Sequence, residues 1–198
     1  MGARRAGEAG GGRRGGVVIR RAEGRDAGRL TRLVRNSRAY EGRYSSMVEG
    51  YRVGPDYIEA HRVFVAVEGA ADGAGPGGRA TGREAGKATE PEAGQGTERV
   101  WGFYALMVEP GELDLMFVAD QAQGYGIGRR LIGHMLDEAR RAGLDSVRVV
   151  SHPPAEGFYR SMGARLVGTV PANPPAVRWD RPEFAFLVGS GGKKSLVR

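Results

Sequence analysis

Residues 112–128 read ELDLMFVADQAQGYGIG, and no other stretch of the sequence says as much about the fold. The first seven residues alternate along the chain, with Leu113, Leu115 and Phe117 between Glu112, Asp114 and Met116. This period of two predicts a half-buried β-strand. A glycine-rich turn follows, and apolar residues at helical spacing over about 125–141 predict an amphipathic helix. The stretch is therefore expected to form strand, glycine turn and helix in that order.

The glycine turn at 123–128 predicts an anion-binding site. Glycines let the backbone approach a ligand closely, and the first N–H groups of a helix have no partner inside it. The positive end of the helix dipole lies there too, so a phosphate or pyrophosphate fits. Two nucleotide-binding motifs are excluded by residue: Arg129-Arg130 stand where a Walker loop needs Lys-Ser/Thr, and Leu131 stands where a Rossmann fingerprint needs its third glycine.

The rest of the chain predicts a mixed sheet with helices on its faces. Asp26 is expected to cap a first helix, and 36–62 reads as helical but irregular, broken near Gly54-Pro55. Pro153-Pro154 is expected to open a short helix. The other strands are expected at 17–21, 63–67, 100–108, 146–150, 164–170 and 184–188. The strands 63–67 and 100–108 are interpreted as a hairpin with a long insertion at its tip.

Composition predicts one domain at 17–189 with polar additions. The 34 glycines concentrate in 1–16 and 69–99, which lack a large apolar content and are expected to be a disordered tail and a disordered insert. Most of the net charge of +7 comes from 1–16 and from a basic C-terminal tail at 190–198, so the domain itself is nearly neutral. Nucleic acid is therefore an improbable partner. The absence of cysteine excludes disulfides and thiolate chemistry.

Two motifs resemble the GNAT (GCN5-related N-acetyltransferase) superfamily. Gln123-x-x-Gly126-x-Gly128 is similar to motif A of that family, and 155–164, which reads AEGFYRSMGA, is similar to motif B. The resemblance extends over roughly 17–188 without the insert. It implies the GNAT acyl-CoA N-acyltransferase fold, an α/β (α+β) architecture with a central, splayed mixed β-sheet flanked by helices.

The resemblance also implies the site and its co-substrate, acetyl-CoA. The pantetheine would pair with the backbone of Met116, Phe117 and Val118. The pyrophosphate would lie on the backbone N–H groups of the glycine turn, formed by Gln123, Gly124, Tyr125, Gly126, Ile127, Gly128 and Arg129. Tyr159, which matches the tyrosine of motif B, would donate a proton to the leaving thiolate. Family members often carry an Asn near the pantetheine, and only Ser151 stands in the corresponding stretch here.

A base must take a proton from the amine, and the sequence offers several. Glu112, at the start of the strand, is the first candidate, and Asp114 is the alternate and a candidate substrate contact. His152 is a further candidate, whereas His134 is expected on the exposed side of its helix. Three scattered histidines without cysteine suggest no metal. Tyr40 and Tyr44 are candidate contacts for an amine substrate with apolar or planar parts, although tyrosines in helices more often serve packing.

The sequence thus predicts an acetyl-CoA-dependent N-acetyltransferase that acetylates a primary amine of a small molecule or a protein by direct attack. Two alternatives stay open. One is a catalytically degenerate GNAT-fold module that binds partners through its basic tails, and the other is a transferase for a longer acyl-CoA. No apolar run is long enough to span a membrane, so a cytoplasmic monomer or homodimer is expected.

Overall fold

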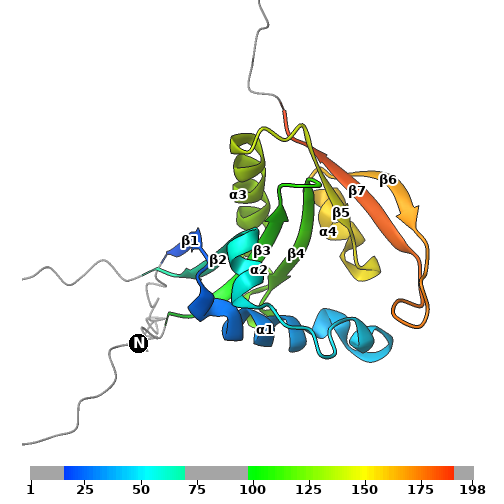
Figure 1. Ribbon diagram of the computed structural model, residues 1–198, viewed down its shortest axis with the longest axis horizontal. Coiled ribbons are helices and arrows are strands. Elements are labelled where there is room, and N and C mark those ends of the chain that lie inside the picture. Colours follow the sequence, from blue (N-terminus) through cyan, green and yellow to red (C-terminus); the bar gives the residue numbers. More distant parts are fainter. Residues whose placement is uncertain (1–15, 70–97, 190–198) are drawn as a thin grey trace, which may run out of the picture.

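The computed structural model describes residues 16–69 and 98–189. The predictions for the two basic tails and for nearly all of the insert lie outside these ranges. Within them, a seven-stranded mixed sheet runs in the order β1-β2-β3-β4-β5-β7-β6 (Figure 1). All neighbouring strands are antiparallel except β4 and β5, which are parallel. The predicted mixed sheet with flanking helices is confirmed.

The elements follow the predicted order along the chain. The strands are β1 (Val17–Arg21), β2 (Arg62–Glu68), β3 (Val100–Met107), β4 (Glu112–Val118), β5 (Ser146–Val150), β6 (Arg165–Val170) and β7 (Arg181–Leu187). The α-helices are α1 (Ala27–Arg35), α2 (Pro55–Ala60), α3 (Ile127–Arg141) and α4 (Glu156–Ser161). The irregular segment at 36–62 holds short 3₁₀ helices at 38–40 and 42–47 before α2, which Pro55 opens at its first position.

The predicted β2–β3 hairpin is present, and its two strands are held together up to the insertion. The amide of Glu68 donates to the carbonyl of Arg99 at 3.0 Å. Beyond it, Glu98 accepts hydrogen bonds from Arg20, whose guanidinium also pairs with the fully buried Asp26. Asp26 does precede α1, but its carboxylate does not cap that helix. It binds Arg20 and the amide of Glu23 instead, so the predicted cap is wrong.

β4 contains a bulge that the regular sequence pattern conceals. Ala105 of β3 pairs with Leu115, but the next residue, Leu106, pairs with Leu113, so Asp114 is an extra residue in β4. An extra residue shifts the phase of the strand by one. Leu113 therefore belongs to the core cluster beneath α3 and α4, while Leu115 belongs to the cluster beneath α1. The predicted strand is confirmed, but its apolar residues do not share one face.

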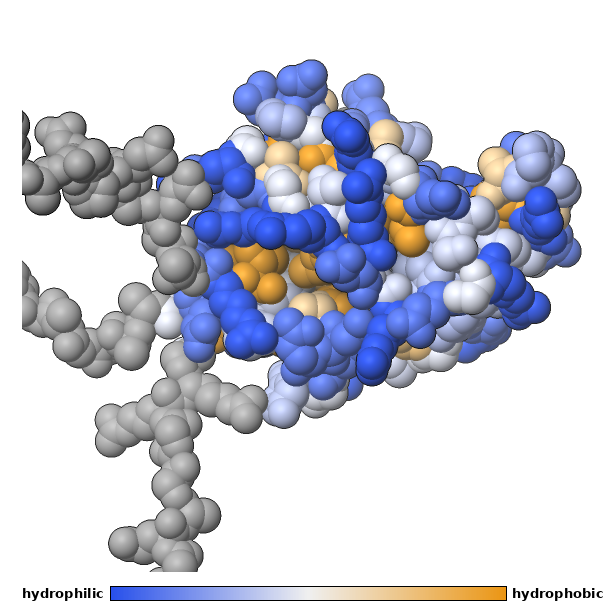
Figure 2. Space-filling model, turned by 90° about the horizontal axis from the view of Figure 1, so that it is seen from below, coloured by the Kyte–Doolittle hydropathy of each residue, from blue (hydrophilic) through white to orange (hydrophobic). Residues whose placement is uncertain are grey.

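β4 and β5 separate soon after they meet, and this divergence positions the site. Their only ladder pair is Glu112 with Arg148, near the start of β4. Residues 113–118 therefore have strand neighbours on the β3 side alone. α3 and α4 cover one face of the sheet and α1 covers the other (Figure 1). The surface seen from below shows apolar residues between ridges of hydrophilic ones (Figure 2). No helix in the described part of the chain could cross a bilayer.

Candidate active site

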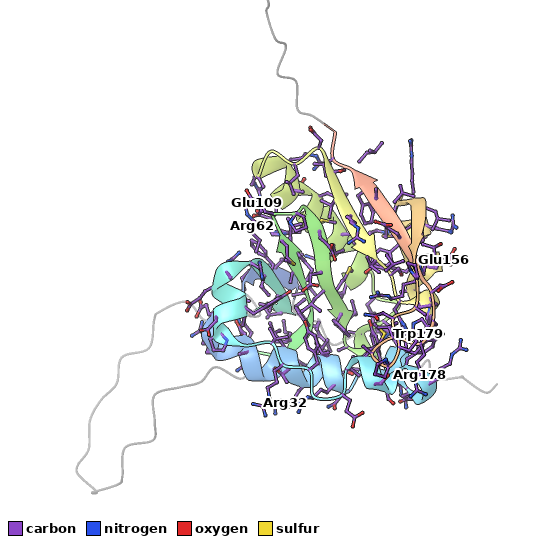
Figure 3. The ribbon with its side chains drawn as sticks, turned by 45° about the vertical axis from the view of Figure 1, so that its right-hand side comes forward. Arg32, Arg62, Glu109, Glu156, Arg178 and Trp179 are labelled. Atoms are coloured by element: carbon purple, nitrogen blue, oxygen red, sulfur yellow. The ribbon has the colours of Figure 1, made fainter. Side chains whose placement is uncertain are left out.

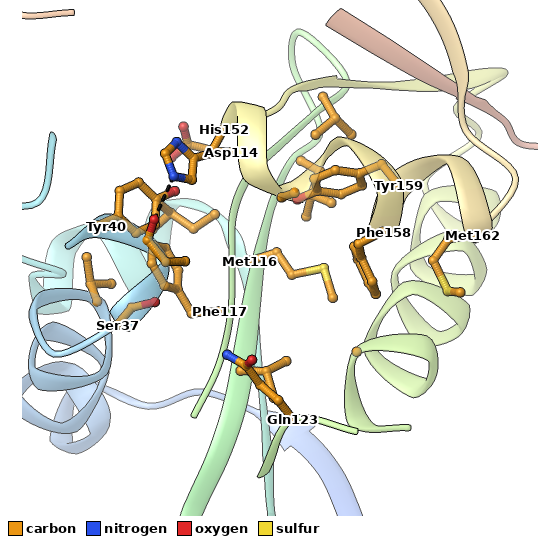
Figure 4. Close-up of a pocket in the computed structure, with 18 of the residues that line it drawn as sticks. Ser37, Tyr40, Asp114, Met116, Phe117, Gln123, His152, Phe158, Tyr159 and Met162 are labelled. Atoms are coloured by element: carbon orange, nitrogen blue, oxygen red, sulfur yellow. Dashed lines mark hydrogen bonds between the residues drawn. The ribbon is translucent and has the colours of Figure 1, made fainter. Parts of the chain in front are cut away.

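A cavity of about 860 Å³ lies where β4 and β5 diverge. Its volume is in the range of sites that enclose a small molecule. The walls come from six parts of the chain: the segment from the end of α1 to Tyr51, β4, the glycine turn with the start of α3, the end of β5, α4, and the start of β7 at Arg181. Figure 4 shows Met116, Phe158 and Tyr159 on one side of this space and Tyr40 and His152 on the other.

The glycine turn lines one end of the cavity. Gly124 and Gly126 have φ of 82° and 75°, a left-handed conformation in which L-residues with a side chain are strained. The first helical hydrogen bond of α3 runs from the Arg130 amide to the Gly126 carbonyl. The amides at 127–129 therefore precede the helical ladder and lie at the positive end of the helix dipole.

The side chains of the turn differ in whether they line the cavity. Arg129 lines the cavity with Gln123, Gly124, Gly126, Ile127 and Gly128. Tyr125 is 64% exposed and does not line it. The Gln123 amide group donates to Asp120 at 3.1 Å, which fixes the entry to the turn. Anion binding here would therefore rest on the backbone and on Arg129, since Arg130 does not line the cavity and donates to the Val17 carbonyl instead.

α4 closes the cavity opposite β4. Phe158 approaches α3 so closely that a Cβ at Gly128 would lie 3.0 Å from its ring. Tyr159 is 8% exposed and packs against Phe184 and Phe186 of β7. Burial raises the pKa of the Tyr159 hydroxyl, so it keeps its proton at neutral pH. It lines the cavity as a potential proton donor.

Both candidate carboxylates on β4 have partners. Arg148 of β5 donates to Glu112 at 2.6 Å and also pairs with Glu183 of β7. These three charged side chains lie where β4 and β5 still pair, at the point from which the two strands separate. Asp114, the bulged residue, accepts a hydrogen bond from the Tyr57 hydroxyl. Glu112 and Asp114 both line the cavity.

An aromatic cluster surrounds His152 at the other end of the cavity. The ring of Tyr40 stacks on His152 at 4.4 Å and on Phe117 at 5.5 Å, measured between ring centroids. Tyr44 meets His152 edge-on at 4.2 Å and Trp179 at 4.6 Å. Tyr40 lines the cavity, whereas Tyr44 packs behind His152 and does not. Burial raises the pKa of Tyr40 to about 12.

The hydrogen bonds of His152 fix its tautomer. Nε2 lies 2.7 Å from the Ala39 carbonyl, which can only accept, so Nε2 carries the proton and Nδ1 carries the lone pair. Nδ1 is buried without a partner. The neighbouring Ser151 hydroxyl donates to the His152 carbonyl at 2.9 Å and does not line the cavity. Ser151 therefore does not occupy the place of the expected Asn contact.

Burial lowers the pKa of His152, which makes stability depend on pH. In the unfolded chain a histidine titrates near 6.5, so below about that pH the unfolded state binds more protons than the folded state. We expect the free energy of unfolding, measured by urea titration, to fall as pH drops from about 7 through the folded pKa. His152→Phe keeps an aromatic ring on Tyr40 but cannot titrate, so its dependence on acid should be weaker. Equal acid dependence in both proteins would contradict this.

Two features of the site differ from the sequence-based view. His134, expected on the surface, is half-buried: its Nδ1 lies 2.7 Å from the Tyr104 hydroxyl and its ring packs on Phe64. Sequence reasoning also missed cavity-lining residues, among them Met47, Val48 and Arg181. The first two lie in an irregular segment without periodicity. Arg181 falls in a loop by pattern, although it begins β7.

Comparison with known proteins finds one family model that matches part of the chain. Residues 92–170 match the family model described as an acetyltransferase (GNAT) domain. No curated protein matches the sequence. Several solved structures share the fold. The ribosomal-protein-S18-alanine N-acetyltransferase of Escherichia coli is 17% identical, with a TM-score of 0.56 over 90% of this chain and 97% of that one.

Two further solved structures share this fold. The Salmonella typhimurium protein yncA, solved with its cofactor acetyl-CoA, is 16% identical, with a TM-score of 0.56 over 92% of this chain and 99% of that one. A GCN5-related N-acetyltransferase from Rhodopseudomonas palustris is 13% identical, with a TM-score of 0.57 over 86% and 94% of the two chains. At these identities the likeness establishes the fold alone.

Proposed function

We propose, from the premise that residues 92–170 form a GNAT acetyltransferase domain, that this protein transfers the acetyl group of acetyl-CoA to a primary amine. One observation carries the proposal. A single cavity joins an anion-binding glycine turn, an unpaired strand edge, a buried tyrosine and a carboxylate. These are the groups that binding a CoA thioester and moving two protons require.

The residues present fit acetyl-CoA. The amides at 127–129 and the Arg129 guanidinium would hold the pyrophosphate. The backbone of Met116, Phe117 and Val118 faces the divergence and has no partner strand there, so its polar groups are available to the pantetheine amides. Phe158 and Met116 would pack against the chain of the pantetheine, because both line the cavity beside Gly128.

The chemistry would be direct attack. The amine nitrogen forms a bond to the thioester carbonyl carbon, and the carbon–sulfur bond breaks with its electron pair going to sulfur. Glu112 would accept the proton of the amine, through water where the distance requires it. Tyr159 would donate its hydroxyl proton to the thiolate. A thiolate is a fair leaving group without help, since thiols have a pKa near 8.5, so Tyr159 contributes less than the base.

Acetyl-CoA binding and CoA release test the proposal together. We expect calorimetric titration to show micromolar binding of acetyl-CoA, and a panel of primary amines to include at least one that makes CoA release depend on the enzyme. CoA release is followed with a thiol reagent, and the protein itself has no cysteine to react. Binding without release for any amine would favour the degenerate binding module. Absence of binding would overturn the assignment of the cavity to CoA.

A further inference from the structure

Buried polar atoms without a partner are concentrated at the end of the cavity near His152, in its lining and directly behind it. Among the described residues there are three: Nδ1 of His152, Nε1 of Trp179 and Nε of Arg181. His152 and Trp179 both contact the ring of Tyr44, and Arg181 lies two residues after Trp179. The loop that carries Trp179 approaches the segment at 36–50 there (Figure 3). Folded proteins leave few such atoms unpaired, so a ligand or an ordered water is expected to complete the hydrogen bonds of the two that belong to cavity-lining residues, His152 and Arg181.

Arg181 presents the only charge of this group. It lines the cavity with His152, whereas Trp179 lies behind Tyr44. In β7 the side chains of Phe184 and Phe186 enter the core beneath α3 and α4, so Arg181 and Glu183 lie on the opposite face. The Pro182 carbonyl accepts from the Ser151 amide, which places Arg181 beside the end of β5 and next to His152.

The guanidinium of Arg181 lacks the partner that comparable arginines have. Arg20, Arg62 and Arg148 are each paired with a carboxylate. Within residues 16–69 and 98–189, the side chain of Arg181 has neither an ion pair nor a hydrogen bond, although the residue is half-buried. A half-buried guanidinium is normally paired, because its charge and its five N–H donors lose water.

The charges around the cavity indicate what would pair with it. Glu112 is bound by Arg148, and Asp114 accepts from Tyr57. Arg129 lies at the glycine turn, where it would serve the pyrophosphate. At the end of the cavity near His152, Arg181 is the positively charged side chain that lines the space, and it offers planar N–H donors. Arg43 is also near His152, but it donates to the Tyr44 hydroxyl and does not line the cavity. A carboxylate matches this charge and geometry bidentately.

We infer that Arg181 is the specificity residue for an acceptor that carries a carboxylate as well as its amine, such as an amino acid or a related amino-carboxylate. The inference rests on the proposed acetyltransferase function and adds the class of acceptor to it. The carboxylate would receive two hydrogen bonds from Arg181. The aromatic faces of Tyr40 and Phe117 would contact the body of the acceptor.

Matched acceptors test the inference. Standard L-amino acids are each compared with the corresponding carboxamide, which keeps the amine and the shape but has no negative charge. We expect kcat/KM for CoA release to favour the carboxylate by roughly 10- to 100-fold, the size of a charge-assisted hydrogen bond. Arg181→Gln should bring the ratio close to one, and Arg181→Lys should restore part of it. Arg178→Gln, in the same loop and exposed, should keep the wild-type ratio.

Direct binding separates this inference from the proposed function. Trp179 is close to Arg181, and Trp101→Phe leaves it as the only tryptophan. Titrating this variant with the same acceptors should change its fluorescence for carboxylates and not for carboxamides, and Arg181→Gln should remove the change. Acetyl-CoA binding, measured separately, should survive in all variants. Equal response to both acceptor series, preference for aminoalkyl phosphates over carboxylates, or no response to any acceptor would overturn the inference even if acetyl-CoA binds.

Discussion

Gly126→Asp should weaken acetyl-CoA binding by at least about 100-fold. Two effects add. The residue at 126 has φ of 75°, which disfavours a side chain, and the new carboxylate would lie beside the amides that would hold the pyrophosphate. A unit charge about 5 Å from another like charge, at an effective dielectric constant of about 20, costs about 3 kcal/mol. That energy alone exceeds a 100-fold change in Kd.

Calorimetry with matched variants separates these effects. Gly126→Ala has the backbone strain without the charge and should weaken binding less. Gly133→Asp places the same charge on the exposed side of α3, where an added Cβ meets nothing within 4 Å. It should bind acetyl-CoA as the wild type does. If Gly126→Asp also binds with wild-type affinity, the glycine turn is not the pyrophosphate site.

Glu112→Gln should lower kcat by about 100-fold or more, because removal of a general base typically costs 10²–10⁴-fold. The Kd for acetyl-CoA should change little, since the proposed contacts of the cofactor lie elsewhere on β4. Tyr159→Phe provides the comparison: it removes only the donor for a thiolate that leaves fairly well unaided, so its loss in kcat should be smaller.

The loss of activity in Glu112→Gln could also come from losing the ion pair with Arg148, and a second variant tests this. Glu112→Gln also removes one of the two carboxylates that bind Arg148, and Glu183→Gln removes the other. Glu183 does not line the cavity. Glu183→Gln should therefore cost comparable stability while keeping kcat. A fall in kcat of the same size in both variants would mean that Glu112 acts by holding Arg148 rather than as a base.

The sequence predicted what local patterns encode. The order of strands and helices, the hairpin around the insertion and the glycine turn before α3 all follow from periodicity and glycine placement over short windows. The bulge at Asp114 did not, because the apolar alternation of β4 continues across it. Only the pairing of β4 with β3 shows that the side chains change faces of the sheet at this residue.

The acceptor end of the cavity was harder to predict, for a similar reason. It combines the irregular segment at 36–50 with residues more than 100 positions away, such as His152 and Arg181. Neither histidine nor arginine carries a pattern that indicates a distant partner. The contact between Tyr40 and His152 depends on 3₁₀ turns, and their short length leaves no period to detect. The glycine turn at the other end was predictable as a structure because one continuous motif forms it.

The bulge in β4 also bears on how this chain can change over generations. Since the strand contributes to two cores and to the cavity, its function depends on the number of residues before Met116 as much as on their identity. Substitutions along β4 each alter one contact. Loss or gain of a single codon near Asp114 would instead turn every later side chain toward the opposite core. Variation in this strand should therefore proceed by replacement at constant length.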